Sequence, residues 1–151
     1  MAFYYLETSA LVKLYVRETG TERLMALANR THENRLAILA LSRVELRSAV
    51  RRRERSGELP APIATLILEA FKRHLEVRFV AQTVSEFVLD VASTLIDRHA
   101  LRAYDAMQLA GYKALRSSTG NEVPVFVCSD LALLRAAELE GIPVLDPSAE
   151  R

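Results

Sequence analysis

Short apolar runs alternate with longer stretches of helical period along the chain. The runs are rich in β-branched and aromatic residues and predict five strands, at residues 3–6, 35–40, 77–81, 123–128 and 143–145. The stretches between them predict helices at residues 8–16, 20–30, 43–56, 61–76, 84–99, 105–117 and 130–139. Strands that alternate with crossover helices form parallel sheets, so we predict an α/β fold with a parallel sheet of about five strands flanked by helices.

The length and composition fit a single domain. The chain has 151 residues, of which 50% are hydrophobic, and this is enough to close one ordinary core. We expect a domain at residues 1–146, followed by a short C-terminal tail at residues 147–151 that is disordered. Because the apolar stretches are too short to cross a bilayer and the N-terminus lacks the pattern of a signal peptide, we expect a soluble, cytoplasmic protein with no membrane partner.

Charge and cysteine content limit the kinds of nucleic-acid binding and cross-linking that the sequence allows. The 20 Lys and Arg residues nearly balance the 19 Asp and Glu residues, so the formal net charge is only +1 and any binding of nucleic acid must be local. The single cysteine, Cys128, has no partner for an internal disulfide. It lies in an apolar run, where a thiol behaves as a small buried hydrophobic group.

Acidic residues follow several of the predicted strands. Glu7 and Asp130 come directly after the first and the fourth strand, and Glu45 lies in the first turn of the helix after the second. Ligands of such sheets bind beyond the carboxyl ends of the strands, so these side chains should meet at one edge. Asp105 opens another helix that can reach the same edge. Clustered carboxylates repel one another unless a cation neutralises them, which favours Mg²⁺ or Mn²⁺.

Helix capping is the alternative explanation for each acid taken alone. Residues 42–45 (Ser-Arg-Val-Glu) fit a capping box, Asp130 fits an N-cap, and Asp105 fits a reciprocal cap with Gln108. Residues 83–86 form an equally good capping box without further motif context, so Glu86 is assigned a structural role. Glu7 is hardest to explain as a cap, because a carboxylate at the end of a buried strand is costly without a partner. Glu7 therefore indicates a functional site rather than a helix cap.

The sequence resembles the PIN-domain family, in particular the VapC-type toxin ribonucleases. Residues 3–15 (Phe-Tyr-Tyr-Leu-Glu-Thr-Ser-Ala-Leu-Val-Lys-Leu-Tyr) are similar to the opening of these toxins, which is an apolar strand followed by Asp, Thr or Ser, Ser, Ala and Leu. Residues 42–46, 101–110 and 128–137 resemble the second, third and fourth blocks of the family, and residues 141–144 resemble its closing segment. One position departs from the pattern, since Glu7 stands where the family usually has Asp.

The resemblance implies a Rossmann-like sheet and a specific activity. Such proteins are metal-dependent endoribonucleases, the toxins of toxin–antitoxin pairs, and they hydrolyse phosphodiester bonds of RNA through a water activated by Mg²⁺ or Mn²⁺. By analogy Glu7, Asp105 and Asp130 hold the principal metal, while Glu45 completes the pocket or binds a second ion. Ser9 would orient the first acid or a bound water. The family also implies two partners, a cognate antitoxin and a second copy in a homodimer.

Three interpretations stay open at the level of sequence. Arg47 and Arg51 share a helix face in a basic run with Arg52, Arg53 and Arg55, and together with Arg102 they are candidate RNA-binding residues, although a solvated helix face is as good an explanation. The apolar stripe of residues 61–76 either faces the core, the favoured interpretation, or forms a hydrophobic clamp for a partner helix; its members are Ile63, Leu66, Ile67, Ala70, Phe71 and Leu75. Finally, Glu7 leaves room for a PIN-like module that binds RNA or a partner with little catalysis.

Overall fold

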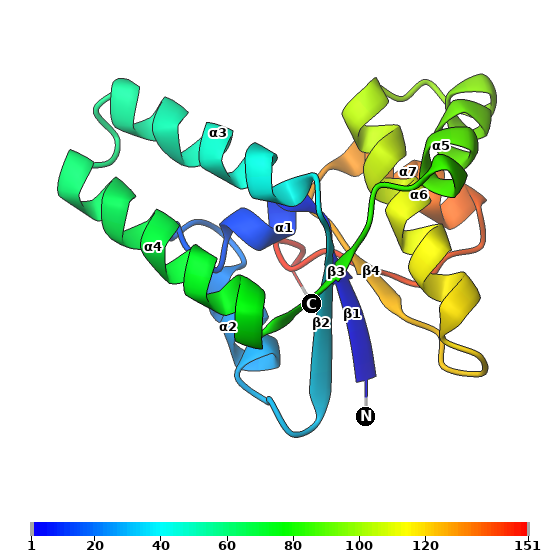
Figure 1. Ribbon diagram of the computed structural model, residues 1–151, viewed down its shortest axis with the longest axis horizontal. Coiled ribbons are helices and arrows are strands. Elements are labelled where there is room, and N and C mark those ends of the chain that lie inside the picture. The colour runs from blue at the N-terminus through cyan, green and yellow to red at the C-terminus, as the bar shows by residue number, and fades with distance from the viewer. Residues whose placement is uncertain (1, 151) are drawn as a thin grey trace.

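The computed structural model (Figure 1) describes residues 2–150 and contains one parallel sheet. Its strands are β1 (Ala2–Leu6), β2 (Asn34–Leu39), β3 (Phe79–Gln82), β4 (Val125–Val127) and β5 (Val144–Leu145). They lie in the order β3-β2-β1-β4-β5, and every neighbouring pair is parallel. The chain runs outwards from β1 to β3 and then crosses to β4 on the other side of β1. The strand order therefore reverses between β1 and β4, which is where sheets of this type bind their ligands.

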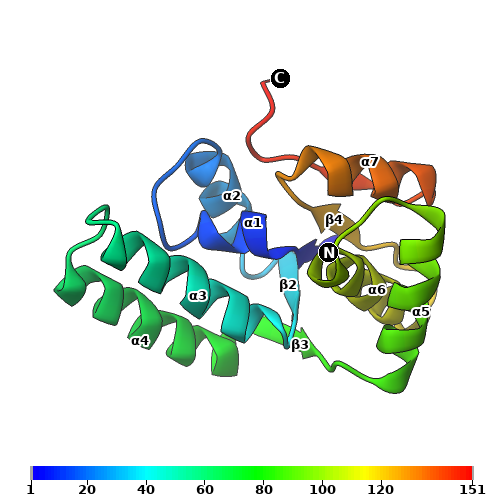
Figure 2. The same ribbon diagram turned by 90° about the horizontal axis from the view of Figure 1, so that it is seen from above.

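In the described residues, seven helices cover the two faces of the sheet, as predicted. Figure 2 shows α1 (Thr8–Val12), α2 (Thr21–Ala28), α3 (Ser42–Arg55) and α4 (Ala61–Val77) on one side. On the other side lie α5 (Glu86–Arg98), α6 (Ala103–Ser118) and α7 (Leu131–Leu139). Helices α3 and α4 run side by side as a hairpin (Figures 1 and 2). The predicted α/β fold, with a parallel sheet flanked by helices, is confirmed.

The two faces have separate hydrophobic cores because successive side chains of a strand point to opposite sides. In β2, Leu36 and Ile38 pack with α1, α2, α3 and α4, whereas Ala37 and Leu39 pack with α5 and α6. All four of these side chains are buried. This explains why the strand is a continuous apolar run rather than an alternating one.

Two predicted strands begin two residues later than expected. Val77 ends α4 instead of opening a strand, and β3 begins at Phe79, because the helical period of α4 continues into the apolar run. Val123 and Pro124 lie outside β4, whose first residue is Val125. Proline has no N–H to donate to a sheet, and the Pro124 carbonyl instead accepts a hydrogen bond of 2.6 Å from the hydroxyl of Tyr112.

The C-terminal tail is anchored, contrary to the disorder expected for it. Pro147 is buried, and the hydroxyl of Ser148 donates to the carbonyl of Thr19 at 3.1 Å. Gly20 allows the tail to pack closely against it. A Cβ at this position would lie 2.7 Å from the carbonyl of Pro147, and the φ of Gly20, 93°, also favours glycine. The expectation failed because the tail's contacts come from residues far away in sequence. Arg151 lies outside the described residues.

Within residues 2–150, no helix is both long enough and apolar enough to cross a membrane.

Candidate active site

The four predicted acids line one cleft at the carboxyl edge of the sheet. The cleft has a volume of about 800 Å³ and lies beside the ends of β1, β2 and β4. Glu7 follows β1, and Glu45 lies in the first turn of α3 after β2. Asp105 lies in the first turn of α6, and Asp130 lies between β4 and α7. Four separate segments therefore bring their carboxylates to the reversal point of the strand order.

Glu7 is the most deeply placed of these acids. Only 5% of its surface is exposed, and its carboxylate accepts hydrogen bonds from the backbone N–H of Ser9, at 2.9 Å, and from the Ser9 hydroxyl. The pKa of Glu7 is raised from 4.5 to about 7, mainly by burial and to a smaller extent by the nearby charge of Glu45, against the lowering effect of the hydrogen bonds from Ser9. Glu7 is also the N-cap of α1, contrary to the expectation that capping explains this acid least well, because its side chain folds back onto its own helix.

Ser9 joins the ends of two strands. Its hydroxyl donates to Glu7 and accepts a hydrogen bond of 2.9 Å from the backbone N–H of Ser129, which follows β4. The sulfur of Cys128 lies 3.7 Å from the same hydroxyl. Cys128 is fully buried and burial raises the pKa of its thiol, so its interpretation as a buried hydrophobic group is confirmed.

Glu45 is held by two donors rather than by a capping box. Its Oε1 atom accepts hydrogen bonds from the Thr8 hydroxyl at 3.0 Å and from the Gln108 amide at 2.7 Å. Partial burial raises the pKa of Glu45, these two bonds lower it, and Asp105 raises it again. The N-cap of α3 is Leu41, without a side-chain cap, so the predicted capping box at residues 42–45 is wrong. The Ser42 hydroxyl instead accepts from Gln108 at 2.9 Å.

Gln108 is a site residue that the sequence analysis missed. It is 1% exposed, and its amide nitrogen contacts Glu45, Thr8 and Ser42, while its oxygen accepts from the Tyr5 hydroxyl at 3.2 Å. The predicted reciprocal cap between Gln108 and Asp105 is therefore not formed. One turn further along α6, Gly111 makes room for the network. A Cβ there would collide with the Tyr5 hydroxyl and lie 2.9 Å from the Cδ1 atom of Leu39.

Asp105 and Asp130 are the more accessible pair. Partial burial and the charge of Asp130 raise the pKa of Asp105, whereas the guanidinium of Arg102 lowers it. Asp130 caps α7, accepting a hydrogen bond of 3.0 Å from the backbone N–H of Leu133, so its predicted capping role is confirmed. The cap does not exclude a second role, because the same side chain lines the cleft. Glu86 is exposed on α5 and does not line it.

Cations lie along the rim of the cleft, but not all at the predicted positions. Arg52 and Arg102 line it as exposed side chains, whereas Lys13 and Arg53 also line it but pair with Glu18 at 3.6 and 3.5 Å. Arg47 instead faces a groove between α3 and α4, and Arg51 pairs with Glu54 at 2.7 Å. The reason is helical geometry: residues seven positions apart share a face, so Arg52 and not Arg51 lies on the face of Glu45.

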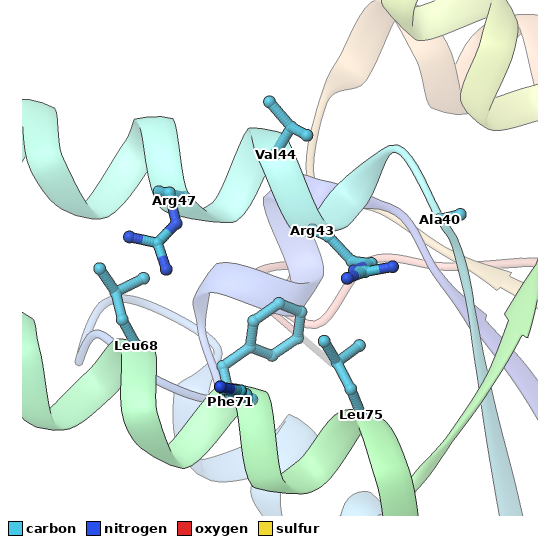
Figure 3. Close-up of a pocket in the computed structure, with 8 residues that line it drawn as sticks. Ala40, Arg43, Val44, Arg47, Leu68, Phe71 and Leu75 are labelled. Carbon is cyan, nitrogen blue, oxygen red and sulfur yellow. The ribbon is translucent and has the colours of Figure 1, made fainter.

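The groove between α3 and α4 has a volume of about 460 Å³. Figure 3 shows Arg43 and Arg47 of α3 directed towards α4, with the ring of Phe71 between Leu68 and Leu75 on the opposite wall. The predicted apolar stripe of α4 is divided between core and surface. Ile67 and Phe71 are buried, whereas Ile63 and Leu66 are 43% and 59% exposed.

The histidines form no competing site. The Nδ1 atom of His74 is 2.7 Å from the hydroxyl of Tyr15, and His99 pairs with Glu140 at 2.9 Å. His32 is exposed in the loop before β2. None of the three lines the acidic cleft.

The donor set fits a hard divalent cation. The cleft offers carboxylate oxygens without a thiol or imidazole, and Mg²⁺ and Mn²⁺ prefer such ligands. Within residues 2–150, no three acidic, histidine or cysteine side chains are arranged to bind one ion together. Mg²⁺ is often bound by one or two carboxylates and several waters, so the spacing of these acids is compatible with it.

Comparison with known proteins agrees with this arrangement. A family model for the PIN domain matches residues 4–119. Among solved structures, VapBC2 from Rickettsia felis bound to a promoter DNA fragment superposes with a TM-score of 0.63 at 14% identity, covering 95% of this chain and 97% of that one. PAE2754 from Pyrobaculum aerophilum superposes with a TM-score of 0.61 at 24% identity, covering 95% of this chain and 83% of that one. FitAcB from Neisseria gonorrhoeae superposes with a TM-score of 0.60 at 16% identity, covering 95% of this chain and 97% of that one.

A search of curated proteins finds no significant match. The structural likenesses show a shared fold, and the family match covers well over half of the chain. With the order of the strands and the position of the acids at their carboxyl edge, these findings lead to one conclusion: the chain belongs to the PIN domain family.

Proposed function

We propose that this chain is a metal-dependent endoribonuclease and acts as the toxin of a toxin–antitoxin pair. The observation that carries the proposal is the meeting of four carboxylates from separate segments in one cleft with a cationic rim. Clustered acids favour a divalent cation, and Lys and Arg side chains favour a polyanion. The toxin role is supported by structural likeness to toxin–antitoxin complexes, including one from Klebsiella pneumoniae with a TM-score of 0.61 at 15% identity.

The proposed roles follow from the placement of the side chains. Asp105, Asp130 and Glu7 would hold Mg²⁺ or Mn²⁺, directly or through water, and Glu45 would complete the pocket or contribute to a second ion. The cation supplies activation of water and neutralisation of charge on the phosphodiester. The protein contributes rigidity, since Ser9 positions the carboxylate of Glu7.

The network behind Glu45 has the same positioning role. Gln108 and Thr8 both donate to Glu45, and Gln108 is anchored in turn by the hydroxyl of Tyr5. These bonds fix the carboxylate before any substrate arrives, which lowers the cost of reaching a reactive geometry. On the rim, Arg52 and Arg102 are exposed and are available to bind the phosphates of RNA.

The test is RNA cleavage by purified chain freed of any antitoxin. Cleavage should require Mg²⁺ or Mn²⁺ and stop in excess chelator. Asp105→Asn and Asp130→Asn should each abolish cleavage without unfolding the protein. The fold of Asp130→Asn should be kept because Asn caps a helix as well as Asp does. Glu86→Gln is the matched control and should change little. Equal cleavage in chelator, or equal activity in all three variants, would show that these acids do not hold a catalytic metal.

A second candidate function rests on the geometry of Glu7. Its carboxylate is folded back onto Ser9, and its pKa of about 7 leaves a large fraction of this group protonated, and so uncharged, near neutral pH. A site impaired in this way suits a PIN-like module that binds RNA or a partner with little catalysis. Titration of Mn²⁺ followed by incubation with RNA separates the two functions. RNA binding without cleavage at saturating metal favours the binding module.

For the antitoxin, we propose the groove between α3 and α4 as the docking site. Arg43, Arg47 and Lys72 surround an apolar wall that includes Phe71 and Leu75, and this combination fits an amphipathic segment with acidic residues. Arg47→Glu should weaken binding of the antitoxin encoded beside this chain, without affecting RNA cleavage by the free toxin. We also propose that the chain forms a homodimer, which sedimentation analysis of the purified toxin would test.

A further inference from the structure

Tyr104 is an aromatic side chain without a structural role in the described part of the chain. It lines the acidic cleft directly before Asp105 and is 63% exposed. Tyr4, by contrast, is partly buried against the core on the side of α1 to α4, and Tyr5, Tyr15 and Tyr112 each pack against another aromatic ring and use their hydroxyl groups in hydrogen bonds. Within residues 2–150, Tyr104 makes neither kind of interaction. Exposing a large aromatic ring in this way does nothing for stability.

Its surroundings suit a nucleotide. Arg102 lies two residues before Tyr104, is exposed, and is close enough to Asp105 to lower the pKa of that carboxyl group. Arg52 reaches the same cleft from α3. An exposed ring that shares a cleft with guanidinium groups is a combination by which proteins hold unpaired bases and the phosphates between them.

Resting on the ribonuclease function proposed above, we infer that Tyr104 is a stacking platform for an unpaired base, with Arg102 and Arg52 holding neighbouring phosphates. Tyr104 and Asp105 are consecutive in the first turn of α6, so a base stacked on this ring lies next to the acidic site. A base in a duplex is already stacked on both faces and is not available to the ring. The site therefore selects single-stranded RNA, and Tyr104 is a specificity-determining residue.

The chain contains no tryptophan, which permits a direct test. Tyr104→Trp, made together with Asp130→Asn to suppress cleavage, places a single indole at the proposed platform. Titration with a short oligoadenylate in Mg²⁺ should quench its fluorescence, whereas a fully paired RNA duplex of the same length should quench it far less. The matched control is Phe87→Trp in the same background, because Phe87 is 50% exposed on α5 and does not line the cleft. Its fluorescence should not respond.

A kinetic test in the otherwise unchanged chain complements the binding test. Tyr104→Ala should raise the KM for single-stranded RNA by about five- to a hundredfold, as expected for one lost base stack, with kcat nearly unchanged. Tyr104→Phe should restore the original KM, because it keeps the ring. Unchanged thermal unfolding of both variants excludes a folding defect.

The outcomes separate this inference from the nuclease proposal. Quenching by single strands in the Trp variant, without cleavage in the parent chain, supports the platform and rejects catalysis. Cleavage with no quenching and an unchanged KM in Tyr104→Ala overturns the platform and leaves the nuclease intact. Equal quenching by single-stranded and duplex RNA overturns the claim of selectivity. Loss of antitoxin binding with unchanged RNA binding would assign Tyr104 to the partner instead, and would also overturn the inference.

Discussion

Glu7 should make the stability of the metal-free protein depend on pH. Burial raises its pKa from 4.5 to about 7 in the folded chain, so the folded chain holds this proton more tightly than the unfolded chain does. Its contribution to stability is then fully present below about 4.5 and is lost as the pH rises through about 7. A pKa rise of this size corresponds to a loss of about 3 kcal/mol.

The measurement is urea unfolding in chelator, comparing the parent chain with Glu7→Gln. The amide keeps the shape of the side chain and an acceptor for the backbone N–H of Ser9, but it does not titrate. Between about pH 5 and about pH 8, the free energy of unfolding of the parent should decrease by about 2 to 3 kcal/mol relative to that of the variant. Using the difference between two chains cancels most of the titration of other groups. Saturating Mn²⁺ should close the gap, since a ligand that binds only the folded, ionised site stabilises it.

Glu86→Gln provides the control, because Glu86 is exposed and lies away from the cleft. Its difference from the parent should be small and independent of pH. If the difference between the parent and Glu7→Gln is equally flat, then Glu7 titrates as an ordinary exposed acid, and the reasoning from its burial is refuted.

Three further variants test the cleft. Glu7→Asp should raise turnover at saturating Mn²⁺ with little change in stability, because Glu is one methylene longer than the family's usual Asp and a displacement of about 1 Å costs on the order of a hundredfold in rate; no gain in rate means that Glu7 is a competent ligand. Gln108→Leu should destabilise the fold by about 1 to 3 kcal/mol, because it leaves the Tyr5 hydroxyl without its acceptor. It should also raise the pKa of Glu45, because it removes a hydrogen bond that lowers this pKa. The loss of unfolding free energy, measured in urea, should therefore be larger above that pKa than below it. Gly111→Ala should be destabilising by a similar amount, about 1 to 3 kcal/mol, since the added methyl group forces Tyr5 away from Gln108; a thermal melt identical to that of the parent would show that α6 shifts freely.

The acids could be predicted because their signals are local. Each one follows a strand or opens a helix, and a rule about parallel sheets converts that position into a place in space. Gln108 gave no such signal. Its partners Tyr5 and Glu45 lie 103 and 63 residues away, so its role exists only after the sheet and α6 have packed together.

The cationic rim was predicted less well, for a geometrical reason. Arg47 and Arg51 share a face with each other, but the orientation of that face relative to the cleft depends on which residue of α3 points inward. Glu45 sets this orientation, and the residue seven positions later is Arg52. The spacing from Glu45 was available in the sequence and would have identified Arg52. The grouping of Arg53 with Glu18, in contrast, depends on a tertiary contact.

The dispersal of the acids along the chain bears on the synthesis of the ribonuclease proposed above. Glu7 and Glu45 come early in the sequence, whereas Asp130 comes 85 residues after Glu45. A chain that is still being translated has no complete cleft until Asp130 has been added, so under the proposed function it would not attack the RNA of the ribosome that makes it. In the same way, one proteolytic cut between Glu45 and Asp105 leaves each fragment with only half of the carboxylates.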